Sequence, residues 1–210
     1  WRNTEVLYHV ATALETYFSA LNVFQYLTFR TILGVLTALG IALLIGPAVI
    51  QRLVLHQVGQ QVRDDGPESH LGKAGTPTMG GALILVAIAV STLLWADLTN
   101  RFVWVALLVT LAFGIIGGID DFLKLARNNS QGLRPRDKFL LQVVAALVAS
   151  TLLYFMAQSS VETSLVLPLY KDLIFPLGGW FILLATLVIV GTSNAVNLTD
   201  GLDGLAIMPT

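Results

Sequence analysis

The sequence predicts an all-α, polytopic membrane protein: a helix bundle with five full spans and the start of a sixth. Hydrophobic residues make up 55% of the 210 residues and charged residues only 12%, and the mean hydropathy is +0.76. Five segments contain about 20 mostly apolar residues each, the length that crosses the hydrocarbon core of a bilayer. A soluble all-α protein with buried helices would not need five runs of this length. The net charge of -1 provides no basic face for nucleic acid, so a nucleic-acid partner is excluded.

The elements follow from the order of apolar and polar segments along a single transmembrane domain, residues 1–210. Residues 1–20 predict an amphipathic helix on the outer surface, because apolar side chains recur there at helical spacing. Alternating β-branched and apolar residues in the loop 158–177 favour a small hairpin. The spans are predicted over residues 23–50, 78–96, 102–119, 139–157 and 178–196, and a sixth starts near Leu202. The chain begins without Met and ends as this segment starts, so we expect it to be the N-terminal part of a longer chain.

The distribution of Lys and Arg sets the orientation of the bundle. Two loops, 51–77 and 120–138, contain eight of the twelve basic residues. These eight are Arg52, Arg63, Lys73, Lys124, Arg127, Arg134, Arg136 and Lys138. Because an excess of basic residues marks the cytoplasmic side, both loops are predicted to be cytoplasmic. The N-terminus and the loop 158–177 then face outward.

Two adjacent carboxylates, Asp120 and Asp121, follow the predicted span 102–119 directly. At the partially negative C-terminal end of that helix they would repel each other and the helix end. A bound divalent cation would reverse this repulsion. With no cysteine in the chain, oxygen ligands favour Mg²⁺ or Mn²⁺. The alternative is a solvated acidic helix end whose charge is balanced by Lys124.

Four polar residues, Asn194, Asn197, Asp200 and Asp203, follow the last full span at intervals of three. On a helix each step of three turns about 300°, so the four side chains form a slanted polar stripe. Polar groups at a span end are costly and are functional candidates by default. The alternative is that one aspartate caps the next helix. The two acidic clusters together predict one metal-dependent site at the cytoplasmic face.

The cytoplasmic segment 63–81 combines Lys73, Thr78 and several glycines at the entry to the second span. Backbone N–H groups at such a helix entry bind phosphate, although the same residues could form only a rigid helix start. The three elements together favour phosphoryl transfer to or from a membrane-embedded acceptor.

These motifs resemble the phospho-N-acetylmuramoyl-pentapeptide transferases. The acid pair and the run Asn194 to Gly204 resemble the wider superfamily of polyprenyl-phosphate sugar-phosphate transferases. The segments Arg63-Asp-Asp-Gly-Pro-Glu-Ser-His70 and Gly75-Thr-Pro-Thr-Met-Gly-Gly81 resemble the muramoyl-pentapeptide branch specifically.

The resemblance implies a homodimer of about ten helices in the bacterial inner membrane, with a periplasmic N-terminus and Mg²⁺ as cofactor. The implied reaction transfers phospho-MurNAc-pentapeptide from UDP-MurNAc-pentapeptide to undecaprenyl phosphate and gives lipid I and UMP, for peptidoglycan synthesis. The implied acidic active-site residues are Asp120, Asp121, Asp200 and Asp203. The implied substrate-binding residues are Lys73, Thr78, Lys124, Asn194, Asn197, Gly201 and Leu202.

The resemblance also implies that the main metal ligand and a histidine-rich loop lie beyond residue 210. Asp120 and Asp121 are possible additional metal ligands. We therefore expect residues 1–210 alone to be inactive. Two rival functions are a polyprenyl-phosphate transferase specific for UDP-GlcNAc, and an ion or proton transporter that uses the acidic residues as a relay. A transporter is expected to place its carboxylates in mid-span, whereas these carboxylates are predicted at span ends.

Overall fold

A computed structural model describes residues 18–55, 80–127, 132–167 and 170–199. The chain divides into two compact units, Trp1–Pro135 and Arg136–Thr210, each with its own packing. Helices dominate both units, and the all-α membrane fold is confirmed.

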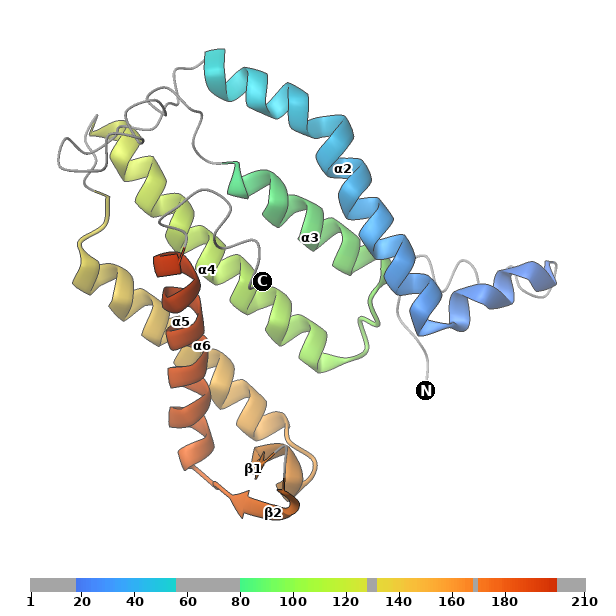
Figure 1. The fold of residues 1–210 in the computed structure, drawn as a ribbon, viewed down its shortest axis with the longest axis vertical. Coiled ribbons are helices and arrows are strands. Elements are labelled where there is room, and N and C mark those ends of the chain that lie inside the picture. The colour runs from blue at the N-terminus through green and yellow to red at the C-terminus, as the bar shows by residue number, and fades with distance from the viewer. Residues whose placement is uncertain (1–17, 56–79, 128–131, 168–169, 200–210) are drawn as a thin grey trace. The chain divides into compact units, whose positions relative to one another are not determined.

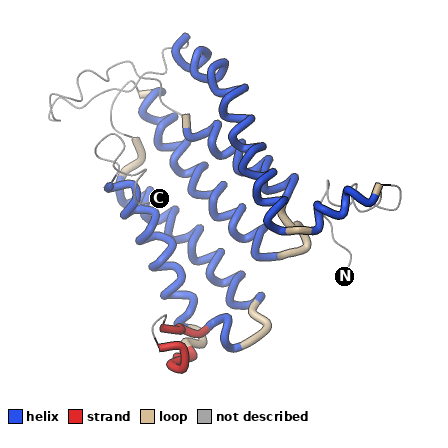
Figure 2. The backbone as a smooth tube through the Cα atoms, turned by 45° about the vertical axis from the view of Figure 1, so that its right-hand side comes forward, coloured by secondary structure: helices blue, strands red, loops and turns tan. Residues whose placement is uncertain are grey.

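The first unit contains a 3₁₀ helix, η1 (Ser19–Gln25), and three α-helices. These are α2 (Leu27–Leu55), α3 (Gly81–Trp95) and α4 (Arg101–Ala126). α3 contacts both of its neighbours and lies between them (Figure 1; Figure 2). The start of α4 is capped by Asn100, whose side-chain oxygen accepts a hydrogen bond of 3.0 Å from the backbone N–H of Phe102.

Glycines allow the helices of the first unit to pack closely. Gly46 of α2 lies beside Leu83 of α3, and a Cβ built on Gly114 of α4 would overlap the side chain of Leu85. Small residues at helix interfaces favour such close approach in membrane proteins. At the other end of the α2–α3 pair, the indole Nε1 of Trp95 donates a hydrogen bond of 2.8 Å to the hydroxyl of Thr37.

The second unit consists of two helices joined by a hairpin. α5 (Pro135–Met156) starts at the unit boundary with a proline, which suits the first position of a helix. A short 3₁₀ turn, η3 (Ser160–Thr163), leads into the antiparallel strands β1 (Ser164–Leu167) and β2 (Tyr170–Pro176). α6 (Trp180–Thr199) completes the unit.

Two polar contacts, one buried and one part-buried, join α5 to α6. The hydroxyl of Thr186 donates to that of Ser150 at 3.2 Å, and Ser150 is fully buried. The amide nitrogen of Asn194 donates to the side-chain oxygen of Gln142 at 2.8 Å. Small buried residues on α5, including Ala146, let the two backbones approach each other.

Four of the described helices are long and apolar enough to cross a membrane: α2, α4, α5 and α6. They confirm four of the predicted spans. α3 has 15 residues, or about 22 Å of helix, which is shorter than a hydrocarbon core of about 30 Å. The second predicted span, 78–96, is therefore a shorter apolar helix within the described residues.

The structure also tests the predicted connections. The hairpin in 158–177 is confirmed. The connection predicted over 120–138 is shorter than expected, because α4 continues to Ala126 and α5 begins at Pro135. Its cytoplasmic location stays a prediction. Residues 1–17 of the expected outer helix, residues 56–77 of the first cytoplasmic loop, and the sixth span lie outside the described residues.

Candidate active site

The acid pair lies in the last two turns of α4 and is bridged by one ammonium group. The Lys124 Nζ atom is 2.8 Å from Oδ2 of Asp120 and 3.1 Å from Oδ1 of Asp121. The pairs are four and three residues apart, which are the spacings that bring side chains together on a helix. Two carboxylates and one ammonium carry a net charge of −1, so the cluster retains an attraction for cations.

The two carboxylates differ in exposure and in their contacts. Asp120 is 8% exposed, and its Oδ1 atom accepts a hydrogen bond of 2.7 Å from the backbone N–H of Leu133. The side chain of Asp121 is 39% exposed. Asp120 is therefore held by protein groups at both oxygens, whereas Asp121 is presented to its surroundings.

The prediction that the pair sits at the end of its helix is wrong. α4 continues through Ala126, because Leu123 and Leu125 extend the apolar pattern and Lys124 reaches back to both carboxylates. The effect of a helix dipole falls off within the last turn, so repulsion by the helix end is smaller than expected. The ion pairs of Lys124 with both carboxylates match one part of the alternative, whereas a solvated helix end does not, because Asp120 is buried and α4 continues to Ala126. The expected contact of Lys124 with substrate phosphates stays a prediction.

The donor set at the end of α4 fits a hard divalent cation in part. Mg²⁺ commonly binds proteins through one or two carboxylates and takes its other ligands from water and substrate phosphates. Asp120 and Asp121 supply two such carboxylates. Within the described ranges, no three Asp, Glu, His or Cys side chains gather as a metal site.

A second polar cluster lies on α6. The amide nitrogen of Asn194 donates to Gln142 and to the backbone oxygen of Val190, both at 2.8 Å. Asn197 follows one turn later, is exposed, and belongs to the same continuous helix. The helical part of the predicted stripe is therefore confirmed for Asn194 and Asn197.

Sequence reasoning missed Gln142. The sequence does mark this residue, because Gln142 is a polar amide within the apolar run 139–157, and such a residue in a membrane span needs a polar partner. The structure shows that this partner is Asn194, 52 residues away. Gln142 is 6% exposed, so its amide would be costly to leave unpaired.

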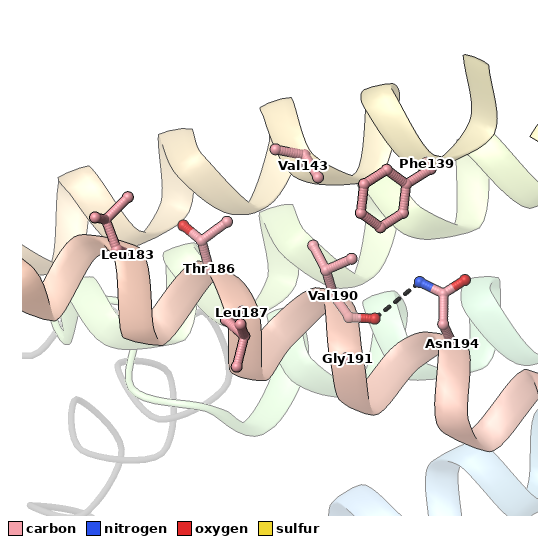
Figure 3. A pocket seen from close by; sticks show the side chains of 8 residues that line it. All are labelled: Phe139, Val143, Leu183, Thr186, Leu187, Val190, Gly191 and Asn194. Atoms are coloured by element: carbon pink, nitrogen blue, oxygen red, sulfur yellow. Dashed lines mark hydrogen bonds between the residues drawn. The ribbon is translucent and has the colours of Figure 1, made fainter. Parts of the chain in front are cut away.

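An apolar cavity of about 390 Å³ opens between α5 and α6, with Asn194 at one end (Figure 3). It is lined by Phe139, Val143, Leu183, Thr186, Leu187, Val190, Gly191 and Asn194. Six of these eight residues are apolar, and the polar groups are the Thr186 hydroxyl and the Asn194 amide. A hydrocarbon chain with a polar group at one end matches this distribution.

The remaining predicted site residues lie outside the described part of the chain. They are Lys73, Thr78, Asp200, Gly201, Leu202 and Asp203. The structure brings Asp120, Asp121 and Lys124 together in the first unit and Asn194 and Gln142 together in the second. The union of both clusters in one site stays a prediction.

A model of glycosyl transferase family 4 matches residues 103–210, which is about half of the chain and includes both acidic clusters. The chain belongs to glycosyl transferase family 4. A second model, the phospho-N-acetylmuramoyl-pentapeptide-transferase signature 1, matches residues 73–85 of this family 4 member. The two matches point to the phospho-N-acetylmuramoyl-pentapeptide transferases among the polyprenyl-phosphate sugar-phosphate transferases, and the predicted resemblance is confirmed.

Proposed function

We propose that this family 4 member transfers phospho-MurNAc-pentapeptide from UDP-MurNAc-pentapeptide to undecaprenyl phosphate, giving lipid I and UMP for peptidoglycan synthesis. The observation that carries the proposal is the match of residues 73–85 to the muramoyl-pentapeptide signature. The same residues contain Lys73 and, at the predicted helix entry, Thr78. The four apolar helices and the cavity between α5 and α6 support an acceptor that is a membrane lipid.

The net reaction exchanges one phosphoanhydride linkage for another. A P–O bond forms between an oxygen of undecaprenyl phosphate and the sugar-linked phosphorus of the donor, and the bond from that phosphorus to the departing UMP oxygen breaks. Catalysis of such transfer depends mainly on positioning and on stabilisation of charge. The two carboxylates suit different tasks. The exposed Asp121 can contact a bound group, and Asp120, held by its hydrogen bonds, can face the acceptor phosphate in one fixed orientation.

Electrostatic repulsion must be overcome before both substrates can bind beside the acid pair of α4. The donor and acceptor are both anionic, and the Asp120–Asp121–Lys124 cluster is itself negative. Mg²⁺, when bound, would be held by Asp121 and Asp120 and would offset the negative charge of the phosphates. Lys73 adds a flexible positive group for the diphosphate.

The proposed setting is the bacterial inner membrane, with the active site at the cytoplasmic face, a periplasmic N-terminus and a homodimeric assembly. The excess of basic residues in 51–77 and 120–138 supports this orientation. The acid pair lies near one end of α4, as a site at the membrane surface requires. A mid-span relay of a transporter has no support among the described residues.

Product analysis tests the proposal directly. The full-length protein is incubated with Mg²⁺, undecaprenyl phosphate and either UDP-MurNAc-pentapeptide or UDP-GlcNAc. We expect UMP and lipid I from the muramoyl donor only. A lipid-linked GlcNAc phosphate would instead assign the enzyme to the other branch. Loss of product on chelation, with recovery when Mg²⁺ is restored, tests the cofactor.

A further inference from the structure

The segment that precedes α5 contacts the buried carboxylate of α4. The backbone N–H of Leu133 donates to Oδ1 of Asp120 at 2.7 Å, across 13 residues of sequence. Gly132 lies against the same side chain: a Cβ built on it would overlap Oδ1, Cγ and the backbone oxygen of Asp120. The absence of a side chain at Gly132 is therefore what lets the N–H of Leu133 reach the carboxylate.

This contact and the ammonium group hold the carboxylate from two sides. Oδ2 of Asp120 is 2.8 Å from Lys124 Nζ, while Oδ1 receives the Leu133 N–H. Hydrogen bonds to a charged acceptor are shorter and stronger than those between neutral groups. The short distances and the 8% exposure of Asp120 restrict its side chain to one orientation.

We propose that Gly132 and the backbone N–H of Leu133 are a positioning element that fixes Asp120 for phosphoryl transfer. The inference rests on the proposed function, in which Asp120 acts at the reacting phosphates. Neither Gly132 nor Leu133 needs to touch a substrate, because both act through Asp120. A displacement of about 1 Å at a reacting group can cost roughly 100-fold in rate, so loss of this support has a measurable effect on turnover.

The first test is Gly132→Ala in the full-length protein, with kcat and KM measured for UDP-MurNAc-pentapeptide. The added methyl group pushes against Asp120. We expect kcat per folded enzyme to fall by about 10- to 100-fold, with KM for the nucleotide substrate close to wild type. The thermal midpoint falls as well, because the overlap includes the backbone oxygen of Asp120. The split between kcat and KM separates a positioning role from a general loss of folding.

Matched controls isolate the two parts of the contact. Gly114→Ala, on α4, introduces a comparable overlap with the side chain of Leu85, away from the acid pair. It should lower the thermal midpoint and leave kcat per folded enzyme unchanged. Leu133→Ala keeps the N–H donor and should retain turnover.

A second variant removes the donor without adding an atom. Replacing Leu133 by its α-hydroxy acid turns the amide into an ester and deletes the N–H. We expect the same fall in kcat as for Gly132→Ala, even if Gly132→Ala does not fold. Turnover within twofold of wild type in the ester variant overturns the proposal, and so does a loss that only follows the folded fraction. An active Asp120→Asn enzyme would instead overturn the assumed role of Asp120. The two variants therefore distinguish a wrong positioning role for Leu133 from a wrong catalytic role for Asp120.

Discussion

The hydrogen bond between Asn194 and Gln142 offers the sharpest test of the second polar cluster. Replacing Gln142 by Leu removes the acceptor and keeps a side chain of similar size in a site that is 6% exposed. The other contact of the Asn194 amide nitrogen, 2.8 Å from the backbone oxygen of Val190, is retained. The variant therefore loses one interhelical hydrogen bond of 2.8 Å and leaves one donor partly unsatisfied.

The expected cost follows from measurements on membrane helices. Interhelical hydrogen bonds there contribute about 0.6 kcal/mol on average and about 1.7 kcal/mol at most. Because Gln142 is well buried, we expect the free energy of unfolding to fall by more than this average, by about 1 kcal/mol. For a protein of this size that loss corresponds to a fall of about 2–4 °C in the thermal midpoint.

A double-mutant cycle in mixed micelles measures the coupling. The free energy of unfolding is determined for wild type, Gln142→Leu, Asn194→Leu and the double variant. We expect a coupling energy of about 0.5–1.5 kcal/mol. Gln142→Leu combined with Thr186→Val, at the other α5–α6 contact, is the control and should be additive. A coupling energy of zero between Gln142 and Asn194 would refute the reasoning.

Three further outcomes are expected. Asp120→Asn and Asp203→Asn should each abolish lipid I formation while membrane insertion and folding are retained, and near-normal product from either variant would remove that residue from the mechanism. Lys73→Ala should raise KM for the UDP substrate more than it lowers kcat, since its ammonium is a flexible point charge for phosphate; an unchanged KM would mark a solvated lysine. At the turn before α4, the side-chain hydrogen bond from Thr99 keeps the pKa of Asp97 below its ordinary value of 3.8. Its stabilising contribution is therefore present above pH 3.8 and is lost as the pH falls through the lowered pKa. Comparing the thermal midpoints of wild type and Asp97→Asn between pH 6 and about pH 3 checks the sign, and parallel curves would contradict it.

The sequence predicted the features that depend on local pattern. Long apolar runs predicted the four spans that the structure confirms, and the alternation of Val161, Thr163, Leu165 and Leu167 predicted the hairpin. The acid pair predicts a helix boundary at residue 119, whereas α4 ends at Ala126. Lys124 neutralises part of that charge within the helix, and its spacing of four and three residues from the pair was a readable signal.

The contacts that shape the two clusters could not be derived in this way. Leu133 approaches Asp120 through its backbone N–H, a group that every residue other than proline carries and that sequence pattern therefore does not mark. The partnership of Gln142 with Asn194 depends on how two separate helices face each other. Local propensity determines whether each helix forms, whereas tertiary packing determines which side chains meet.

The two polar contacts between α5 and α6 are spaced alike on both helices. Gln142 and Ser150 are eight residues apart, and so are their partners Asn194 and Thr186. In an antiparallel pair both contacts therefore belong to one register, and a slip of one turn, about 5.4 Å, would break them together. The alignment of the pair is thus encoded in the helices themselves and does not depend on the connection that joins them. Residues inserted at the turn between β1 and β2 should consequently be tolerated, which makes this turn a suitable place for an epitope tag.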